Sequence, residues 1–457
     1  MTRRSLTGWG RTAPSVAHVV GEVSSDDARR AVTTAGRRGI LARGLGRSYG
    51  DAAQNGGGVV AELAERSIQL DLASATVTAG AGATLDELIR TLLPQGFFVP
   101  VTPGTRQVTV GGAVAADIHG KNHHSDGSWA NHVVDLDLVL ANGESVTVGP
   151  ERDAPLFWAT IGGMGLTGVV TACRFRAIPV QSGLMSVDTW RTSDLDETMA
   201  LMVERDGDYR YTVAWLDATS TGGRLGRGVV TMADHASAQD AAPDLSLEFD
   251  ESARVGVPPL VPGGLLNAAT IRAFNELWYR KSPRQRSGEL QGISEFFHPL
   301  DMVRDWNRLY GRRGMLQYQF VVPNGAEDTL RRAVERLVAG GAASFLTVLK
   351  RFGPSNDGHL SFPFPGWTLT LDIPAGIGGL SALLDDLDDR LVEVGGRVYL
   401  AKDSRLAARN LARMYPRLDE WRAVCERVDP AGVFQSDLSR RLGMRPFTNP
   451  SMPLEAR

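Results

Sequence analysis

Length, composition and charge limit what this chain can be. With 457 residues, 43% hydrophobic and 22% charged, it has an ordinary globular composition and is long enough for two or three domains. The net charge is −3, and acidic and basic residues are interspersed, so no basic patch for binding nucleic acid is visible. The two cysteines are far apart in the sequence and form neither a disulfide framework nor a metal-ligand spacing.

The N-terminal segment contains Arg3 and Arg4 but not the apolar stretch of a secretory signal. Nowhere do about 18 apolar residues follow one another, so the sequence predicts no transmembrane helix. We expect a cytoplasmic protein or one held peripherally at the cell membrane. The sequence does not decide on which side of that membrane it lies, and the cell-envelope side is one alternative.

Short strands alternate with helices over residues 14–180. Ser24 and Thr84 are expected N-caps, because each precedes acidic residues and a helical spacing of apolar side chains. The Asn-Gly turn at 141–144 lies between alternating runs and predicts a hairpin. The expected elements are helices at 25–35 and 84–93, strands at 39–43 and 133–140, and a glycine-rich turn within 162–170 that enters a strand.

The character of the sequence changes near residue 182, where strand-like runs alternate with long amphipathic helices. This pattern predicts an α+β domain whose antiparallel sheet is covered by helices on one face. Residues 251–290 are rich in Pro, Gly, Arg and Ser, and we expect a mobile loop or lid there. The expected strands are 185–190, 209–217, 315–322, 344–351 and 367–373, and the expected helices are 193–204, 299–310, 326–339 and 378–394.

Two glycine-rich segments, residues 42–51 and 103–124, carry the clearest chemical signal. Glycines permit positive φ and expose backbone N–H groups that can hold a pyrophosphate. The first segment is not G-x-G-x-x-G before a helix, so it fits a Rossmann dinucleotide site poorly. An ordinary loop in the first segment and a tight helix-packing turn in the second are the plainer interpretations.

The second segment ends in a cluster of titratable residues. His119 and His123 are four residues apart, which is a metal-ligand spacing on a helix. Gly120 and Asn122 disfavour a helix, however, and no acidic residue stands where a zinc hydrolase needs its base. We therefore expect no metal site and interpret these histidines, with Lys121, as groups offered to a flat or anionic ligand.

Lysine is rare in this chain, since only four of the 49 basic residues are lysines. Arginine stays charged, whereas a buried lysine can shift its pKa and take part in proton transfer. Lys121 and Lys402 are better candidates for such a role than Lys281. The plainer alternative is that these lysines remain by chance in an arginine-rich composition. Lys402 follows Tyr399 in a late segment, residues 399–405, where a surface Lys–Asp pair is the plainer alternative.

A predicted strand at residues 315–320 places Gln317 and Gln319 on one face. Buried amides need hydrogen-bond partners, and either sugar hydroxyls or neighbouring backbone could supply them. Trp278 and Tyr279 lie within the expected lid and could cover a lipid tail, although core aromatics would look the same.

In combination these motifs resemble the vanillyl-alcohol-oxidase type of FAD oxidoreductases, and within it the family that oxidises polyprenylphosphoryl ribose in actinobacterial arabinan synthesis. The resemblance runs from residue 6 to residue 437. It implies a flavin domain of residues 1–181, to which residues 397–457 return, and a substrate domain of residues 182–396. The tail after about residue 442 is expected to be disordered.

The resemblance implies FAD as the cofactor. Covalent members of the superfamily link the flavin to a histidine where this chain has Arg47, so non-covalent binding is expected. The residues implied in cofactor binding are Ala42, Arg43, Gly44, Leu45, Gly46, Arg47, Ser48, Tyr49, Gly50, Asp51, Gly104, Thr109, Val110, Gly111, Gly112, Ala116, Asp117, Ile118, His119, Val170 and Tyr399.

The same resemblance implies oxidation of the C2 hydroxyl of a polyprenylphosphoryl-β-D-ribose to a keto sugar. It further implies an NAD-dependent keto-sugar reductase as partner subunit and peripheral membrane contact. Lys402 and His119 are expected to orient and deprotonate the hydroxyl, with either of them as the base, and Tyr49 is expected to assist. The implied substrate-binding residues are Lys121, Gln317, Gln319, Lys350, Phe352, Thr368, Thr370 and Lys402.

This chain departs from the family on the substrate side. Phe297 stands where mycobacterial members have Tyr, and Thr368 and Thr370 stand where they have Asn and Cys. A related glycosyl phosphate therefore stays open as the substrate. The alternative enzyme is an alditol or aldonolactone oxidase of the same superfamily that uses oxygen, and the alternative from another class is a flavin-free binding protein.

Overall fold

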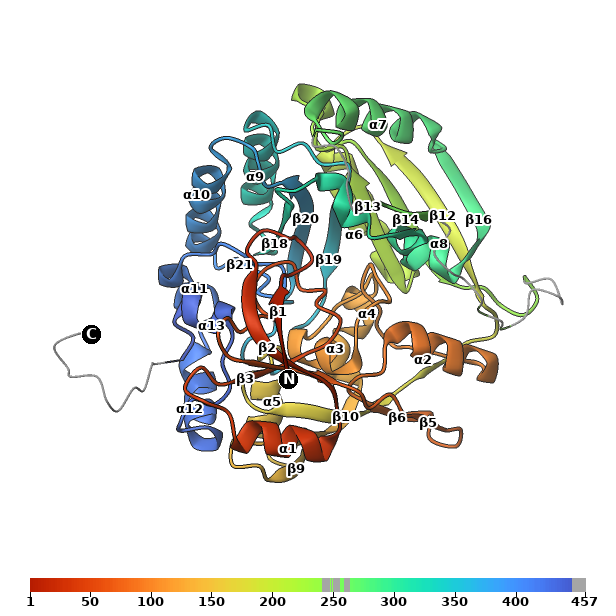
Figure 1. Cartoon of the computed structure of the whole chain (residues 1–457). Coiled ribbons are helices and arrows are strands. Elements are labelled where there is room, and N and C mark those ends of the chain that lie inside the picture. The colour runs from red at the N-terminus through yellow and green to blue at the C-terminus, as the bar shows by residue number, and fades with distance from the viewer. Residues whose placement is uncertain (241–246, 248, 250–254, 259–263, 446–457) are drawn as a thin grey trace.

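The computed structural model describes residues 1–240, 247, 249, 255–258 and 264–445 and shows an α+β molecule (Figure 1). Two sheets form its N-terminal region. In the four-stranded sheet β2 and β3 run parallel to β4, and the five-stranded sheet is antiparallel. The strand order of the four-stranded sheet is β1 (Thr2–Leu6), β2 (Ser15–Val23), β4 (Val59–Leu63) and β3 (Ile40–Arg43). The strand order of the five-stranded sheet is β5 (Ile68–Asp71), β6 (Thr76–Gly80), β10 (Val169–Arg176), β8 (Val133–Val139) and β9 (Ser145–Val148).

Capping side chains begin the first helices, as predicted. The amide N–H of Asp27 donates to Ser24 Oγ at 3.2 Å, and that of Glu87 donates to Thr84 Oγ1 at 3.1 Å. Each cap satisfies a backbone donor that the first helical turn leaves without a partner. The helices of this region are α1 (Ser25–Thr33), α2 (Leu85–Leu92), α3 (Val110–Ala116), α4 (His123–Asp126) and α5 (Ala154–Thr160).

The middle of the chain forms one antiparallel sheet of eight strands, as the alternation predicted. Its register sets Gln317 opposite Asp372 and Lys350 opposite Thr368, so polar residues from different strands become neighbours. The strand order is β16 (Gln285–Gly292), β12 (Leu184–Thr192), β14 (Gly228–His235), β13 (Tyr211–Leu216), β19 (Thr347–Phe352), β20 (Gly366–Pro374), β18 (Met315–Pro323) and β21 (Arg397–Val398).

The two faces of this sheet meet different partners, because side chains alternate along each strand. Tyr318 donates its hydroxyl to Asp388 of α10 (Leu380–Glu393) at 2.9 Å, and α6 (Leu195–Arg205) and α9 (Glu327–Ala339) also pack against the sheet. Gln317 and Gln319 point to the opposite face, towards the N-terminal region. That face remains available for a site.

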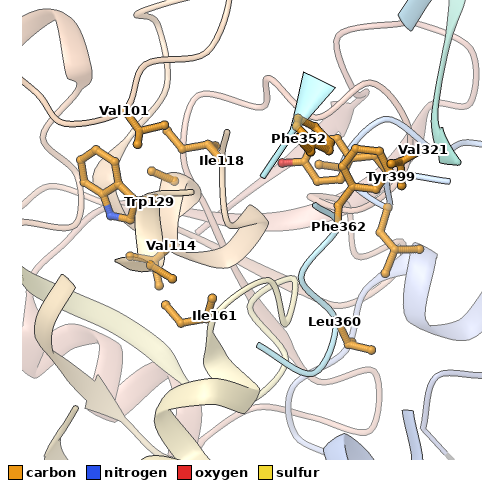
Figure 2. Packing of buried hydrophobic residues seen from close by; sticks show 14 of the residues in the cluster. Val101, Val114, Ile118, Trp129, Ile161, Val321, Phe352, Leu360, Phe362 and Tyr399 are labelled. Atoms are coloured by element: carbon orange, nitrogen blue, oxygen red, sulfur yellow. The ribbon is translucent and has the colours of Figure 1, made fainter. Parts of the chain in front are cut away.

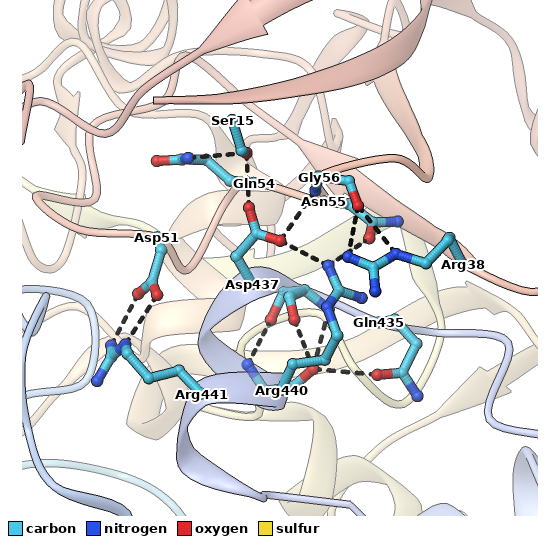
Figure 3. Close-up of polar contacts among 12 residues, drawn as sticks. Ser15, Arg38, Asp51, Gln54, Asn55, Gly56, Gln435, Asp437, Arg440 and Arg441 are labelled. Atoms are coloured by element: carbon cyan, nitrogen blue, oxygen red, sulfur yellow. Dashed lines mark hydrogen bonds and ion pairs between the residues drawn. The ribbon is translucent and has the colours of Figure 1, made fainter. Parts of the chain in front are cut away.

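The C-terminal segment returns to the N-terminal region. Phe434 forms a parallel bridge with Ile40 at the edge of β3, and Asp437 accepts the amide N–H of Gly56 at 2.9 Å. Arg441 donates two hydrogen bonds of 2.8 Å to Asp51 (Figure 3). The helices of this segment are α11 (Ala408–Met414), α12 (Leu418–Val428) and α13 (Asp437–Leu442).

Large apolar side chains join the N-terminal region to the sheet. Val114 of α3 belongs to the same buried cluster as Trp129, while Phe362 stacks on Tyr399 with ring centroids 4.7 Å apart (Figure 2). Trp129 and Phe362 are fully buried. The core is therefore continuous between the parts of the chain that we expect to form separate domains.

Residues 299–310 do not form the predicted helix. Two 3₁₀ turns, Pro299–Met302 and Trp306–Tyr310, stand in its place. Asp305 between them has a φ of 56°, in the left-handed region, which interrupts helical hydrogen bonding. The prediction of a helix was therefore wrong in this segment.

The prediction of a loop over residues 251–290 was wrong for its larger part. Residues 268–281 form helix α7 (Ala268–Lys281), which buries Ile271 and Asn275, and β16 follows it as an edge strand. Residues 251–254 and 259–263 of that segment, and the predicted tail from residue 446, lie outside the described residues. None of the described helices is long and apolar enough to span a bilayer.

Candidate active site

A cavity of about 980 Å³ lies between the glycine-rich segments and the open face of the eight-stranded sheet. Most of the predicted site residues line it. They are Ala42, Arg43, Gly44, Leu45, Gly46, Arg47, Ser48, Tyr49, Gly104, Thr109, Gly111, Gly112, Ala116, Ile118, His119, Lys121, Val170, Gln317, Gln319, Lys350, Thr370, Tyr399 and Lys402.

The two glycine-rich segments touch each other in the wall of this cavity. A Cβ on Gly44 would lie 2.2 Å from Thr109 Oγ1, so only glycine fits at this position. Gly46 has a φ of +65°, which turns the chain, and the guanidinium of Arg43 donates to the Thr7 carbonyl at 2.8 Å. The Arg43 hydrogen bond thus holds the loop of residues 43–47 in place, and this loop lines the cavity.

Arg47 follows this turn and is held against Trp9, with its guanidinium carbon 4.0 Å from the ring centroid. Its Nε is buried and has no hydrogen-bond partner among the described residues. A buried donor without a partner is costly, and an anionic ligand would satisfy it. Gly104 also lines the cavity, and a Cβ at this position would meet no other atom within 4 Å, so close packing does not require glycine there.

His119 lies at the centre of a buried polar cluster. Its Nε2 is 3.0 Å from Gln319 Nε2, and its Nδ1 is 3.2 Å from Lys350 Nζ. The ring packs edge-on against Phe352 and beside Tyr399. Burial, with the nearby charge of Lys350, holds the pKa of His119 well below its ordinary value, so the imidazole is neutral at pH 7.

Three of the four lysines gather in this cavity, and Lys281 is exposed at the end of α7. Burial, reinforced by neighbouring ammonium groups, lowers the pKa of Lys121 and of Lys350 to about 7. Burial also lowers the pKa of Lys402, to about 8, with a smaller opposing effect of Asp372. Lys121, Lys350 and Lys402 thus share one cavity in which burial disfavours their charged form.

Lys402 and Tyr49 meet where the C-terminal segment closes the cavity. The ammonium nitrogen of Lys402 is 4.3 Å from the ring centroid of Tyr49, whose backbone N–H donates to the Ala401 carbonyl at 3.0 Å. Tyr399 donates its hydroxyl to the Ala116 carbonyl at 2.8 Å, which ties this segment to α3. The late segment is therefore not a surface Lys–Asp pair.

Asp372 is a buried carboxyl that the sequence analysis missed. Gln317 Nε2 donates to its Oδ1 at 2.5 Å, and its Oδ2 has no partner among the described residues. Burial raises the pKa of Asp372 to about 7, against the opposing effect of the Gln317 hydrogen bond. Its position opposite Gln317 in the sheet was the signal that could have found it, but that register is not visible in one strand alone.

Three residues predicted to bind the cofactor support the cavity wall instead of lining it. Gly50 is backed by the C-terminal segment, since a Cβ there would lie 2.0 Å from the Asp403 carbonyl oxygen. Asp51 pairs with Arg441, and Val110 is fully buried in the core. These residues position the loops and do not face the cavity.

Three further residues that were expected to bind the cofactor or the substrate do not line the cavity either. Asp117 turns inward at a φ of 41° and accepts hydrogen bonds from Ser128 and Asn356. Phe352 packs behind His119, and Thr368 is covered by Gln319, whose amide lies 3.3 Å from its hydroxyl. Neighbouring side chains separate all three from the cavity.

Aromatic residues of the middle of the chain form a wall that sequence reasoning mostly missed. Trp215 and Phe345 line the cavity together with Trp278, which was considered as a lipid cover. Tyr279 does not line it, because its hydroxyl donates to the Thr192 carbonyl at 3.1 Å. The cavity thus has a polar end near His119 and an aromatic flank.

The residues present fit FAD. A long cavity walled by close-packed glycine loops, with the unpartnered Arg47 donor beside it, suits a dinucleotide with a pyrophosphate. Among the described residues, no group of three His, Cys, Asp or Glu side chains could hold a metal ion. His123 instead accepts the amide N–H of Gly353 at 3.2 Å.

Comparisons with known proteins extend over this site. The FAD binding domain family matches residues 16–149, and the D-arabinono-1,4-lactone oxidase family matches residues 380–442. Decaprenylphosphoryl-beta-D-ribose oxidase of Mycolicibacterium smegmatis is 46% identical over 453 residues, 96% of this chain and 98% of that protein. An uncharacterized protein in mprA 5'region of Streptomyces coelicolor is 42% identical over 373 residues, 79% of this chain and 100% of that protein.

A more distant relative matches a shorter part of this chain. Cytokinin dehydrogenase 10 of Oryza sativa subsp. japonica is 29% identical over 149 residues, 31% of this chain and 27% of that protein. The fold class, the FAD cofactor and the predicted resemblance are confirmed by these matches. The chain is an FAD-dependent oxidoreductase and belongs to the decaprenylphosphoryl-β-D-ribose oxidase family.

Proposed function

We propose that this enzyme oxidises the C2 hydroxyl of a polyprenylphosphoryl-β-D-ribose to the keto sugar, the first half of epimerisation to the arabinofuranose donor of cell-wall arabinan. The relative from Mycolicibacterium smegmatis bears the name of an oxidase of decaprenylphosphoryl ribose. The observation that carries the proposal is the buried cluster of His119, Gln319 and Lys350, with Lys402 in the same cavity. Such a cluster can hold and deprotonate a sugar hydroxyl.

The loops around Gly44, Arg47 and Gly111 would hold FAD without a covalent bond, because the linking histidine of covalent relatives is replaced by Arg47. When bound there, FAD accepts the hydride that leaves the carbinol carbon. The protein positions the two reactants and manages the proton and the charge. Tyr49 and Tyr399 would define the wall on which the flavin ring rests.

Of the two candidate bases, Lys402 is the better placed in terms of pKa. A general base works best when its pKa is near the operating pH. The pKa of Lys402 is lowered to about 8, whereas the pKa of His119 is held well below its ordinary value by burial. In this proposal Lys402 takes the hydroxyl proton and neutral His119 orients the hydroxyl by hydrogen bonding.

The remaining polar groups would bind the sugar phosphate. Gln317 and Gln319 offer amides on one sheet face, and Thr370 offers a hydroxyl beside them. Lys350 and Lys121 supply positive charge that an anionic phosphate would neutralise. An NAD-dependent keto-sugar reductase would act on the product, and contact with the membrane would be peripheral.

A second function is favoured by one observation. The D-arabinono-1,4-lactone oxidase family matches the segment that contains Lys402, which is compatible with an alditol or aldonolactone oxidase that uses oxygen. A related glycosyl phosphate is a third substrate to test, because Thr370 alters the cavity wall and Phe297 lines it too.

The test is an anaerobic visible spectrum of the purified protein before and after addition of a short-chain prenylphosphoryl ribose. We expect the flavin band to bleach with this substrate and not with free alditols. Bleaching by alditols or aldonolactones alone would reject the proposal in favour of the second function. Bleaching by neither would reject both substrates for this flavoprotein.

A further inference from the structure

Helix α7 lies at the outer edge of the molecule (Figure 1), and it exposes a stripe of apolar side chains. Phe274, Leu277 and Trp278 lie three and four residues apart, which places them on one side of the helix, and all three are exposed. Leu265, just before the helix, is also exposed. Contiguous exposed apolar side chains of this kind mark a surface that binds a partner.

The side of α7 next to the stripe is held against the rest of the molecule, so the stripe has a defined orientation. Asn275 Nδ2 donates to Asp217 at 2.9 Å and to the Ser344 carbonyl at 3.1 Å, and Ile271 is buried beside it. Asn267 caps the first turn. The exposed residues are therefore presented outward by a rigid helix.

The stripe continues into the cavity. Phe274 and Trp278 are both exposed and part of the cavity lining, and their rings stack with centroids 6.3 Å apart and an interplanar angle of 11°. Phe345 lies deeper and meets Phe274 edge-on at 5.9 Å. An apolar path thus runs from the exposed side of α7 towards the site.

Lys281 lies on the same side of the helix as this stripe, four residues after Leu277 and three after Trp278, and more basic residues follow it. Residues 264–288 contain five basic side chains and one carboxylate, in a chain whose net charge is −3. Lys281, Arg284 and Arg286 are exposed, and Arg280, also exposed, pairs with Glu276 at 2.6 Å. An aromatic and leucine stripe flanked by Lys and Arg is the pattern of a helix that lies in the interface of an anionic bilayer.

We propose that α7 docks the enzyme on an anionic lipid bilayer, with Leu277 and Trp278 in the boundary between headgroups and acyl chains. This inference rests on the proposed function, in which the substrate carries a polyprenyl chain. Docking in this orientation turns the aromatic flank of the cavity towards the membrane. A protein partner fits less well, because protein interfaces are depleted of charge at their core, whereas Lys281 lies on the same side of α7 as the stripe.

The experiment uses the full-length, FAD-loaded protein and co-sedimentation with vesicles. One set of vesicles is phosphatidylcholine alone, and the other is an equimolar mixture with phosphatidylglycerol. We expect binding to the anionic vesicles, weaker binding at high salt, and little binding to the neutral ones. Absence of binding to the anionic vesicles would overturn the proposal.

A pair of substitutions distinguishes binding through the stripe from non-specific adsorption of the protein to vesicles. Leu277 is 68% exposed and outside the cavity lining, and Leu72 in the turn after β5 is a matched control at 62% exposure. We expect Leu277→Asp to lower the vesicle partition coefficient by about tenfold or more, and Leu72→Asp to leave it unchanged. Equal partition of the two variants would contradict the docking of α7.

A charge-reversal variant, Lys281→Glu with Arg284→Glu, should weaken binding by about tenfold or more on anionic vesicles only. If Leu277→Asp instead converts a dimer to a monomer in sedimentation velocity, the stripe is an interface between copies and the proposal fails. Flavin reduction by a soluble short-chain prenylphosphoryl ribose is measured on the same samples. Its absence in the wild type rejects the proposed function, whereas its presence without vesicle binding rejects the docking alone.

Discussion

Lys121, Lys350 and Lys402 place three amino groups inside one cavity, where burial lowers the pKa to about 7 for the first two and to about 8 for Lys402. Burying a charge without a partner is costly. The chain retains these groups although its composition otherwise strongly favours arginine. We infer that the cost is offset when an anionic ligand binds, so the cluster trades stability for function.

Lys402→Ala should lower the rate of anaerobic flavin reduction by about 100-fold or more, because a positioned base contributes at least that much. FAD content should stay unchanged. In the wild type the rate should rise with pH through about 8, since the base must be neutral, and this limb should vanish in the variant. Rapid-mixing kinetics across pH measure both effects.

Lys281→Ala is the matched control, because Lys281 is exposed and remote from the cavity lining. It should reduce its flavin at the wild-type rate with an unchanged pH profile. A Lys402→Ala protein that retained both the rate and the pH limb would remove Lys402 from the chemistry.

Residues that face the cavity were predictable only in part. The glycine loops and the lysines stand out by composition, which explains why Gly44, Gly111 and Lys402 were found. The contacts of Asp372 and Thr368 could not be predicted in the same way. Each is made by a glutamine of another strand, Gln317 for Asp372 and Gln319 for Thr368. Such contacts depend on strand register, which a single sequence does not reveal.

Among the elements, the two glycine-rich segments act as a pair through the contact of Gly44 with Thr109. Gly44→Ala would force Cβ against the Thr109 hydroxyl, and overpacking of this kind costs about 1–3 kcal/mol. We expect roughly tenfold weaker FAD retention, measured by titration of the flavin-free protein with FAD.

Gly36→Ala serves as the control for this substitution, since a Cβ at Gly36 meets nothing within 4 Å. It should retain FAD as the wild type does. Equal FAD affinity in the two variants would show that the Gly44–Thr109 contact does not shape the cofactor cavity.

Elements with strong local signals were predicted well, and the failures have a non-local cause. The capped helix α2 and the hairpin of β8 and β9 follow from local sequence patterns. Helix α7 was predicted as a loop because its stability depends on Asn275 binding to Asp217, which lies far away in the sequence. At residues 299–310 the positive φ of Asp305 ended a pattern that looked helical.

For the whole molecule, the buried lysines should make stability depend on pH. Unfolded lysines keep their proton to about pH 10.5, whereas the folded ones release it near 7 to 8. Between about pH 7.5 and 8.5 the unfolded chain therefore binds more protons, and the free energy of unfolding should rise with pH. Asp372 and Asp388, with pKa values of about 7 and 6, titrate mostly below this window.

Urea unfolding followed by tryptophan fluorescence measures this slope, which is at most about 1.4 kcal/mol per pH unit for each lysine. Lys350→Met should reduce the slope by about a third, because one of the three contributing groups is removed. A free energy of unfolding that stays flat or falls over this window would contradict the placement of charged lysines in the cavity.

The wall of the cofactor cavity is assembled from residues at opposite ends of the chain. During synthesis the ribosome delivers the loop around Gly44 early, whereas Tyr399, Lys402 and the Arg441 partner of Asp51 emerge last. Capture of FAD must therefore wait until translation is nearly complete. Until then the glycine loops exist without the residues that complete the wall of the cavity.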